Sequence, residues 1–350
     1  MPVYKDEQRG TWYCCFYYTD WQGKRKRKYK RGFSKQREAK EFERAFLAKS
    51  QGSPQMTFKD LADLCFEDAR KRLRLVTMQS KEQVLRTQIL PYWADVQIAN
   101  IKPADVRKWQ NEIIAKGYAP TTLKIINNQF VSILNYAVKY CGLRENPCSI
   151  AGTMGKKKPK EMLFWTKEEY SQFIKVVDRT EIHAAFQIMY WCGLRVGELL
   201  ALDRGDIDLE KKVIRVTKSQ QRIAAKDVIT PPKTPKGIRD VVMPDFLCEE
   251  LSVYLDSLYN KAPETRLFSY SRTVLYNQIV KNSEKAGVKK IRVHDLRHSH
   301  VSLLIDMGFS APAIADRVGH ESIDITYNYA HLFPSKQTEM AVKLNVERGC

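Results

Sequence analysis

Four short segments after residue 160 hold the side chains best suited to chemistry. Residues 193–200 contain an arginine and a glutamate, residues 231–237 two lysines, and residues 294–299 two histidines and an arginine. The fourth segment has a histidine and, nine residues later, a tyrosine. The members of the set are Arg195, Glu198, Lys233, Lys236, His294, Arg297, His298, His320 and Tyr329. The arginines, lysines and histidines of this set are suited to holding a phosphate group.

The two arginines are predicted to line one cleft. Arg195 and Glu198 are three residues apart on an otherwise apolar helix, so the carboxylate can fix the orientation of the guanidinium. A charge in a buried helix is rarely tolerated without a partner or a ligand. Arg297 follows His294 at the same spacing, and the apolar positions after it predict that this face packs inward. Because guanidinium groups bind nonbridging oxygens bidentately, the pattern indicates a phosphate clamp.

The patterns of several common catalytic centres are missing from the sequence. It has no Gly-x-Ser-x-Gly elbow, no P-loop and no aspartate-rich cluster for two metal ions. His294 and His298 could share a helix face, but His300 would point elsewhere, so no metal site is predicted. Composition alone does not choose the nucleophile.

The charge balance points to a polyanionic partner. Lys and Arg number 59 against 40 Asp and Glu, a net charge of +19, and residues 1–50 alone carry 14 basic and 6 acidic side chains. An excess of this size and clustering is typical of nucleic-acid-binding proteins, with a basic surface kept for solubility as the simpler alternative. A membrane surface is the other candidate, but no amphipathic helix or lipidation signal accompanies the basic run.

Two linkers, at residues 50–54 and 151–160, divide the chain into three predicted domains: 1–52, 57–150 and 161–350. In the first domain, residues 11–18 and 24–31 read as a hairpin joined by a turn at 20–23. Ser34 is expected to cap a helix that covers one face of this hairpin, leaving the basic strand and its tyrosines on the other face. A basic β-ribbon of this kind fits the major groove of DNA.

The middle domain reads as four helices. Thr57 is predicted to cap the first, Pro103 to open the third, and Gly117 and Gly142 to end the third and fourth. The fourth carries an apolar stripe of helical period made by Leu123, Ile126, Phe130, Leu134, Ala137 and Val138.

The last domain mixes helices with a predicted antiparallel meander of residues 213–216, 227–230 and 239–243. The expected fold is therefore multidomain α+β: a small hairpin with a helix, a helical bundle, and a mainly helical domain with a small antiparallel sheet.

The sequence also bears on the compartment. No stretch approaches the roughly 18 apolar residues of a membrane span, and the first residues lack the apolar core of a signal peptide, so a cytoplasmic protein is expected. Its eight cysteines include no Cys-x-x-Cys pair, and the adjacent Cys14 and Cys15 would point to opposite faces of a strand. Neither a disulfide framework nor a structural zinc site is predicted.

The ordered chemistry-bearing set resembles the catalytic domain of the tyrosine recombinases, the phage-integrase family. The motifs that carry the resemblance are Gly-Leu-Arg-Val-x-Glu, His-Asp-Leu-Arg-His, and Gly-His ahead of Tyr-Ala-His. The matching residues are Arg195, Lys233, His294, Arg297, His320 and Tyr329. The resemblance covers the whole chain, because a helical core-binding domain precedes the catalytic one. The basic hairpin with its helix resembles, less specifically, the arm-binding domain of integrases from phages and conjugative transposons.

The resemblance implies a role for each member of the set. Tyr329 would attack the scissile DNA phosphate and form a 3′-phosphotyrosine with a free 5′-hydroxyl. Both arginines would stabilise the charge on the nonbridging oxygens, Lys233 would protonate the leaving oxygen, and the two histidines would position or share protons with the phosphate and the tyrosine. Neither ATP nor a metal is required. Tyr327 competes with Tyr329, which the nine-residue step from His320 favours, and Lys236 remains an alternative to Lys233.

The family also implies the partners. They are double-stranded DNA attachment sites, a homotetramer on DNA that exchanges C-terminal segments such as residues 340–346, and accessory DNA-bending or excision proteins. The activity implied is integration or excision of a mobile element. Two rival interpretations are a type IB topoisomerase, which relaxes DNA with similar tyrosine chemistry, and a noncatalytic DNA-binding regulator on the same fold.

Overall fold

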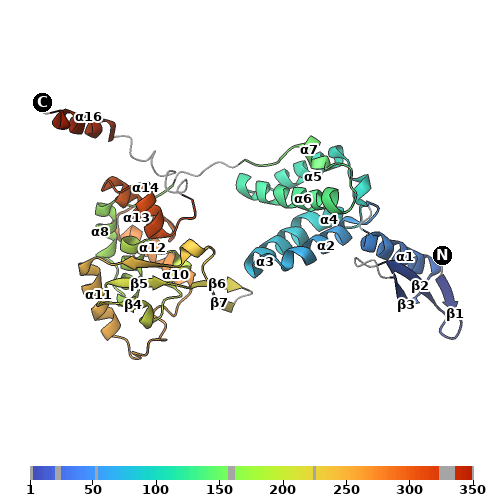
Figure 1. The fold of residues 1–350 in the computed structure, drawn as a ribbon, viewed down its shortest axis with the longest axis horizontal. Coiled ribbons are helices and arrows are strands. Elements are labelled where there is room, and N and C mark those ends of the chain that lie inside the picture. The colour runs from blue at the N-terminus through green and yellow to red at the C-terminus, as the bar shows by residue number, and fades with distance from the viewer. Residues whose placement is uncertain are drawn as a thin grey trace. The chain divides into compact units, whose positions relative to one another are not determined.

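The structure is a computed structural model that describes residues 3–19, 25–51, 54–156, 162–223, 226–322 and 336–348 (Figure 1). It divides into two compact units, Met1–Pro159 and Lys160–Cys350. The boundary falls in the glycine- and lysine-rich linker, while the division into three domains stays a prediction. Among the described residues, no helix is long and apolar enough to cross a membrane.

The first unit begins with a three-stranded antiparallel sheet and a helix. The strands β1 (Val3–Asp6), β2 (Thr11–Thr19) and β3 (Arg25–Phe33) are hydrogen-bonded in that order, and α1 (Gln36–Gln51) packs on one face. The strand β1 was not predicted. Cys14, Phe16 and Ala39 form the small core, whereas Cys15 is partly exposed, so the two cysteines do point to opposite faces.

The start of α1 differs from the prediction that Ser34 caps it. The helix begins at Gln36, and the cap is the carboxylate of Glu38, which accepts hydrogen bonds from the backbone N–H groups of Ser34 and Lys35 and from the Ser34 hydroxyl. A carboxylate in the first turn satisfies more than one unpaired N–H and suits the positive end of the helix.

Cations occupy both faces of β3, because successive strand residues point in opposite directions. Lys28 lies over the ring of Phe46 and Lys30 over the ring of Phe42, so these lysines cover the helix side. The other face carries arginines and tyrosines in contact: Tyr4 with Tyr13, Tyr13 with Tyr29, Arg25 with Tyr17, and Arg31 with Tyr29. The expected basic face is thus an arginine and tyrosine face.

The remainder of the first unit is helical: α2 (Phe58–Arg70), α3 (Leu75–Val84), a π-turn (Leu85–Ile89), α4 (Leu90–Trp93), a 3-10 turn (Ile98–Asn100), α5 (Pro103–Ala115), α6 (Pro120–Tyr140) and α7 (Pro147–Ala151). Thr57 caps α2 and Pro103 opens α5, as predicted. Both terminating glycines follow their helices with positive φ, +73° at Gly117 and +69° at Gly142. Of the predicted stripe on α6, only Val138 does not belong to the core, because it is 38% exposed.

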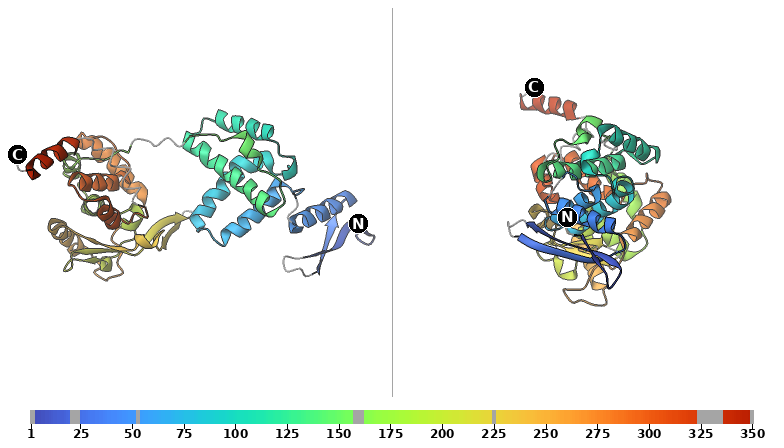
Figure 2. Two further views of the ribbon diagram at one scale, coloured as in Figure 1. Left: turned by 45° about the horizontal axis from the view of Figure 1, so that its top comes forward. Right: turned by 90° about the vertical axis from the view of Figure 1, so that its right-hand side faces the viewer.

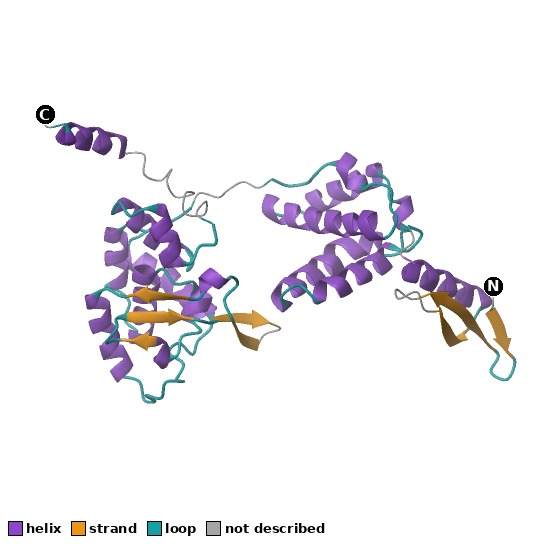
Figure 3. Ribbon diagram, in the orientation of Figure 1, coloured by secondary structure: helices purple, strands orange, loops and turns teal. Residues whose placement is uncertain are grey.

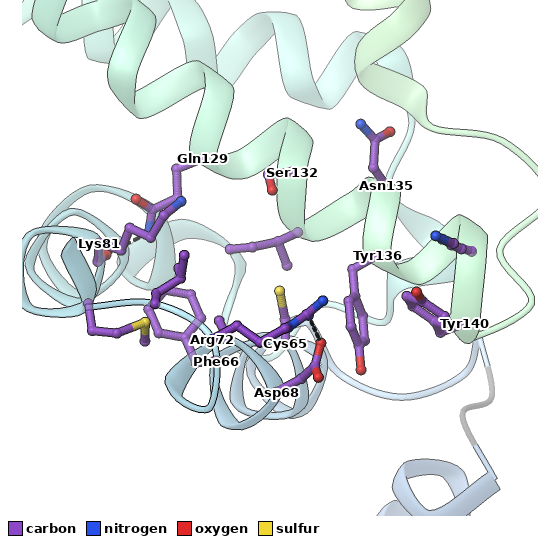
Figure 4. Close-up of a pocket in the computed structure, with 15 residues that line it drawn as sticks. Cys65, Phe66, Asp68, Arg72, Lys81, Gln129, Ser132, Asn135, Tyr136 and Tyr140 are labelled. Carbon is purple, nitrogen blue, oxygen red and sulfur yellow. Dashed lines mark hydrogen bonds and ion pairs between the residues drawn. The ribbon is translucent and has the colours of Figure 1, made fainter. Parts of the chain in front are cut away.

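A cavity of about 290 Å³ lies between α2, α3 and α6 (Figure 4). Phe66 and the thiol of Cys65 lie on one side, and Tyr136 lies on the other with the ion pair of Arg72 and Asp68 close by. None of the predicted catalytic residues lines this cavity.

The second unit is mainly helical and contains a small three-stranded sheet with alternating buried and exposed residues. Its elements are α8 (Lys167–Ile174), α9 (Thr180–Cys192), α10 (Val196–Leu199), β4 (Ile207–Asp208), β5 (Val213–Val216), β6 (Ser219–Ile223), β7 (Lys226–Thr230), β8 (Arg239–Val242), α11 (Asp245–Asp256), α12 (Arg272–Ala286), α13 (Asp295–Asp306), α14 (Ala311–Val318) and α16 (Lys336–Glu347). The helix α9 is buried on most sides and packs against α11 and α13, so it forms the centre of the core. Figure 3 shows the helices and the small strands of this unit.

The predicted meander is wrong in its pairing. The strand β5 pairs with β4 and β8, whereas β7 pairs with β6 in a separate two-stranded hairpin that extends away from the three-stranded sheet (Figure 2). The sequence Ser-Gln-Gln-Arg-Ile of β6 is polar and shows no strand alternation, which is why it was missed.

Candidate active site

Arg195 lies between two helices and not within one continuous helix. The helix α9 ends at Cys192, Gly193 takes the left-handed conformation with φ +64°, and Arg195 is the residue before the short helix α10. The predicted pairing with Glu198 is present: the Glu198 carboxylate accepts from Nη1 of Arg195 at 2.7 Å and from its backbone N–H at 3.0 Å. The prediction of one apolar helix was wrong because the glycine interrupts it.

The turn at Gly193 tolerates no side chain. A Cβ atom there would lie 2.5 Å from Cδ2 of His300, which is 2% exposed. Together with the positive φ, this contact restricts the position to glycine. The turn at Gly193 therefore fixes the end of α9 and the position of Arg195, two residues later.

Arg297 is buried at 2% exposure and donates to two backbone carbonyls. Its Nη1 lies 2.7 Å from the oxygen of Gly193, and its Nη2 lies 2.5 Å from the oxygen of Val318. Arg195 donates from Nη2 to the oxygen of Gly319 at 2.9 Å. The structure thus brings both arginines to the end of α14, where Arg195 is the more open side chain at 38% exposure.

Two predicted histidines adjoin the arginines. His294 precedes α13, and its ring lies 5.0 Å from that of His298 in an edge-on contact. His294 is exposed as a residue, but desolvation of its ring, with His298 and Arg297 next in size, lowers its pKa to about 4. His320 is 5% exposed, and burial with the charges of Arg297 and Arg195 lowers its pKa to about 3. Both imidazoles are therefore neutral at pH 7.

The two candidate lysines lie in the segment between β7 and β8. Lys233 and Lys236 are both exposed, and a 3-10 turn, Pro235–Gly237, closes the segment. The backbone of this segment packs close to the end of α14, since a Cβ at Gly319 would lie 2.7 Å from the carbonyl oxygen of Lys236. The choice between the two lysines stays open.

The sequence prediction missed Arg239, which opens β8. Its side chain is 7% exposed, and its Nη2 lies 3.0 Å from the Glu198 carboxylate. Burial alone would raise the pKa of Glu198, but Arg239 and Arg195 outweigh it and hold that pKa below its usual value. No local pattern marked Arg239, because β8 is largely exposed and the partners Glu198 and Arg317 lie far away along the sequence.

Tyr329 and Tyr327 lie outside the described residues, so the structure places neither candidate nucleophile. Among the described side chains, no group of three or more His, Cys, Asp or Glu could hold a metal ion. The described part of the site is a cluster of two arginines, two neutral imidazoles and a buried carboxylate, next to a segment with two exposed lysines.

Comparison with known proteins decides the family. Residues 164–336 match the phage integrase family, residues 2–50 match an arm DNA-binding domain, and residues 57–114 match the SAM-like N-terminal domain of phage integrases. The ICEBs1 integrase of Bacillus subtilis (strain 168) is 30% identical over 283 residues, which cover 76% of this chain and 77% of that protein. The chain belongs to the phage integrase family. It is a tyrosine recombinase of the type found in phages and conjugative transposons, an enzyme that cleaves and rejoins DNA.

Solved structures share the fold of this integrase. The Tn1549 transposon integrase in complex with a circular-intermediate DNA has a TM-score of 0.67 and 21% identity, and the alignment covers 78% of this chain and 94% of that one. A lambda integrase tetramer bound to a Holliday junction has a TM-score of 0.58 and 16% identity over 94% of each chain. The family match favours recombination over the DNA relaxation of a type IB topoisomerase.

Proposed function

We propose that Arg195, Lys233, His294, Arg297, His320 and Tyr329 form the active site and that the integrase cuts and exchanges DNA at attachment sites through a 3′-phosphotyrosine. The observation that carries the proposal is the convergence of both arginines on the end of α14, where Arg297 donates to two backbone carbonyls and Arg195 to one carbonyl and to Glu198. Preorganised cations stabilise the charge that develops on nonbridging oxygens without a cost of reorganisation during the reaction.

Each step forms one oxygen–phosphorus bond and breaks another. The oxygen of Tyr329 attacks phosphorus, and the bond to the 5′-oxygen breaks while Lys233, or Lys236, supplies a proton to that oxygen. His294 and His320 adjoin the arginines and would position the phosphate or share a proton with the tyrosine. The 5′-hydroxyl of the partner strand then attacks the phosphotyrosine and releases the enzyme, so no external energy source is needed.

The proposed partners follow from the family. They are two classes of double-stranded DNA site, a homotetramer assembled on them, and accessory DNA-bending or excision proteins, with integration or excision of a mobile element in the cytoplasm as the outcome. The arginine and tyrosine face of the N-terminal sheet would bind the second class of site. Its support is the row of exposed cations on β3.

A nicked DNA substrate that traps the covalent intermediate tests the nucleophile. The unaltered protein should give a band of DNA-bound protein that resists denaturant, Tyr329→Phe should lose it while still binding DNA, and Tyr327→Phe should keep it. Loss of the band in the Tyr327 variant alone would move the nucleophile to Tyr327. No band from the unaltered protein on any attachment site would favour the noncatalytic regulator.

A further inference from the structure

Arg239 has contacts that its position in a strand does not explain. Three of its nitrogens donate to three different segments: Nη2 to Glu198 at 3.0 Å, Nε to the carbonyl of Arg317 at 3.0 Å, and Nη1 to the carbonyl of Gly237 at 3.2 Å. The side chain is only 7% exposed, and these bonds occupy both of its terminal nitrogens. Its three donors are therefore directed to groups of the protein, each on a different segment.

The three segments are those that carry the proposed chemistry. Glu198 holds Arg195, and the oxygen Oε2 that accepts from Arg239 also accepts from the backbone N–H of Arg195 at 3.0 Å. Gly237 closes the segment with the two candidate lysines, and Arg317 lies near the end of α14, three residues before His320. The guanidinium of Arg239 thus connects Glu198, the lysine segment of residues 231–237 and the end of α14, which precedes Tyr329 in the sequence.

A guanidinium is suited to this task and an ammonium is not. Its donors lie in a rigid plane and point in fixed directions, so it can hold three acceptors at once. The Arg239 side chain also lies close to the backbone of Gly319, because a Cβ placed there would lie 3.1 Å from Cδ of Arg239. The lysine segment has no helix or strand of its own apart from the 3-10 turn Pro235–Gly237, so its bond to Arg239 restricts where that turn lies.

We propose that Arg239 is a positioning residue that holds the lysine segment against the Arg195 and Glu198 pair, so that the general acid meets the leaving 5′-oxygen. The proposal rests on the proposed function, in which a lysine of residues 231–237 donates that proton. Loss of Arg239 then acts mainly on proton delivery, because Glu198 keeps its own two bonds to Arg195.

The test compares two leaving groups on full-length protein. In one nicked substrate the scissile bond joins phosphorus to a 5′-oxygen, and in the other to a 5′-sulfur. A thiolate leaves with the bonding electron pair and needs no proton, since thiols ionise near neutral pH with a pKa of about 8.5, whereas an alkoxide must be protonated. A defect in proton delivery is therefore rescued by sulfur, and a defect in charge stabilisation or folding is not.

Arg239→Met should slow cleavage of the oxygen substrate by about 100-fold, the usual size of a general-acid effect, and should regain nearly the full rate on the sulfur substrate. Arg215→Met is the matched control, because Arg215 is an exposed arginine of the neighbouring strand β5, and it should cleave both substrates normally. If Arg239→Met does not fold, Arg239→Lys keeps the charge beside Glu198 without the three-way bonding, and the same rescue is expected of it.

Lys233→Ala and Lys236→Ala distinguish the two proposals. If sulfur rescues one lysine variant but neither Arg239 variant, the general acid stands and the role of Arg239 is overturned. If sulfur rescues neither lysine variant, the general-acid assignment itself fails, and the positioning role fails with it. Rescue of one lysine variant and of Arg239→Met together supports both.

Discussion

Replacing Gly193 by alanine should damage the second unit far more than the same change at Gly287. Both glycines follow a helix in the left-handed conformation, with φ +64° after α9 and +67° after α12. They differ in their surroundings: a Cβ at Gly193 would lie 2.5 Å from the buried His300 ring, whereas nothing lies within 4 Å of a Cβ at Gly287. Comparing the two substitutions therefore separates the cost of the left-handed conformation from the cost of the steric clash.

The left-handed conformation costs an alanine about 1 kcal/mol, and forcing a methyl group into a packed site adds roughly 1–3 kcal/mol. We expect Gly287→Ala to lower the free energy of unfolding by about 1 kcal/mol and Gly193→Ala by about 3 kcal/mol. For a unit of this size these losses correspond to roughly 2–4 °C and 6–12 °C in the midpoint of thermal unfolding.

Calorimetry of the full-length variants measures both losses, and covalent trapping on nicked DNA measures the consequence for the site. Gly193→Ala should also slow cleavage, because the Gly193 carbonyl holds Arg297 and Arg195 follows two residues later. Gly287→Ala should cleave normally. Equal destabilisation by the two substitutions would refute the steric argument, and full cleavage by a stable Gly193→Ala would refute the link to the arginines.

Three further predictions concern acid, metal ions and the first domain. Burial is the main cause that lowers the pKa of His300 and of His320 to about 3 in the folded chain, compared with about 6.5 in the unfolded chain. Because the unfolded chain binds the protons more readily, the stability that both histidines contribute is complete above pH 6.5 and is lost as the pH falls toward 3. The loss at pH 5 is about 2 kcal/mol for each histidine, and urea midpoints that do not change between pH 7.5 and 5 would contradict it. Chelator should leave cleavage and strand exchange unaffected, since the arginines already supply cations; loss in chelator with recovery on adding magnesium or zinc would show a metal requirement. Removal of residues 1–52 should leave cleavage of a short core-site duplex intact and abolish efficient recombination of full attachment sites, whereas full rescue by low salt would indicate only nonspecific affinity.

The parts of the fold that were predictable depend on local chemistry. Thr57 caps α2 and Pro103 opens α5 because a hydroxyl and a ring suit those positions in any context. The pairing of β5 with β8 was not predictable, because those strands are joined across residues 217–238 and no local pattern favours that partner over β7. The strand β6 lacks the alternation that reveals a strand, since neither of its faces is fully buried.

The candidate site likewise contains contacts that were predictable from the sequence and contacts that were not. The pairing of Arg195 with Glu198 follows from a spacing of three residues, and it holds although the helix on which it was predicted is interrupted at Gly193. Arg239 was missed because its partners come from positions 41 and 78 residues away, which only the folded chain brings together. Sequence spacing predicts neighbours along an element and does not predict contacts between elements.

The two-sided distribution of charge on β3 bears on how this strand can evolve. A strand with cations on both faces has no apolar pattern to specify its alignment, and a shift by two residues would exchange lysine for lysine opposite α1. Its alignment depends instead on its end, where Gly32 takes φ +89° and Phe33 lies opposite Trp12 and packs on Phe42. The residues before that end can therefore vary among basic and aromatic types with little penalty for folding, which leaves the outer face free to diverge as the DNA sequences it is proposed to bind diverge.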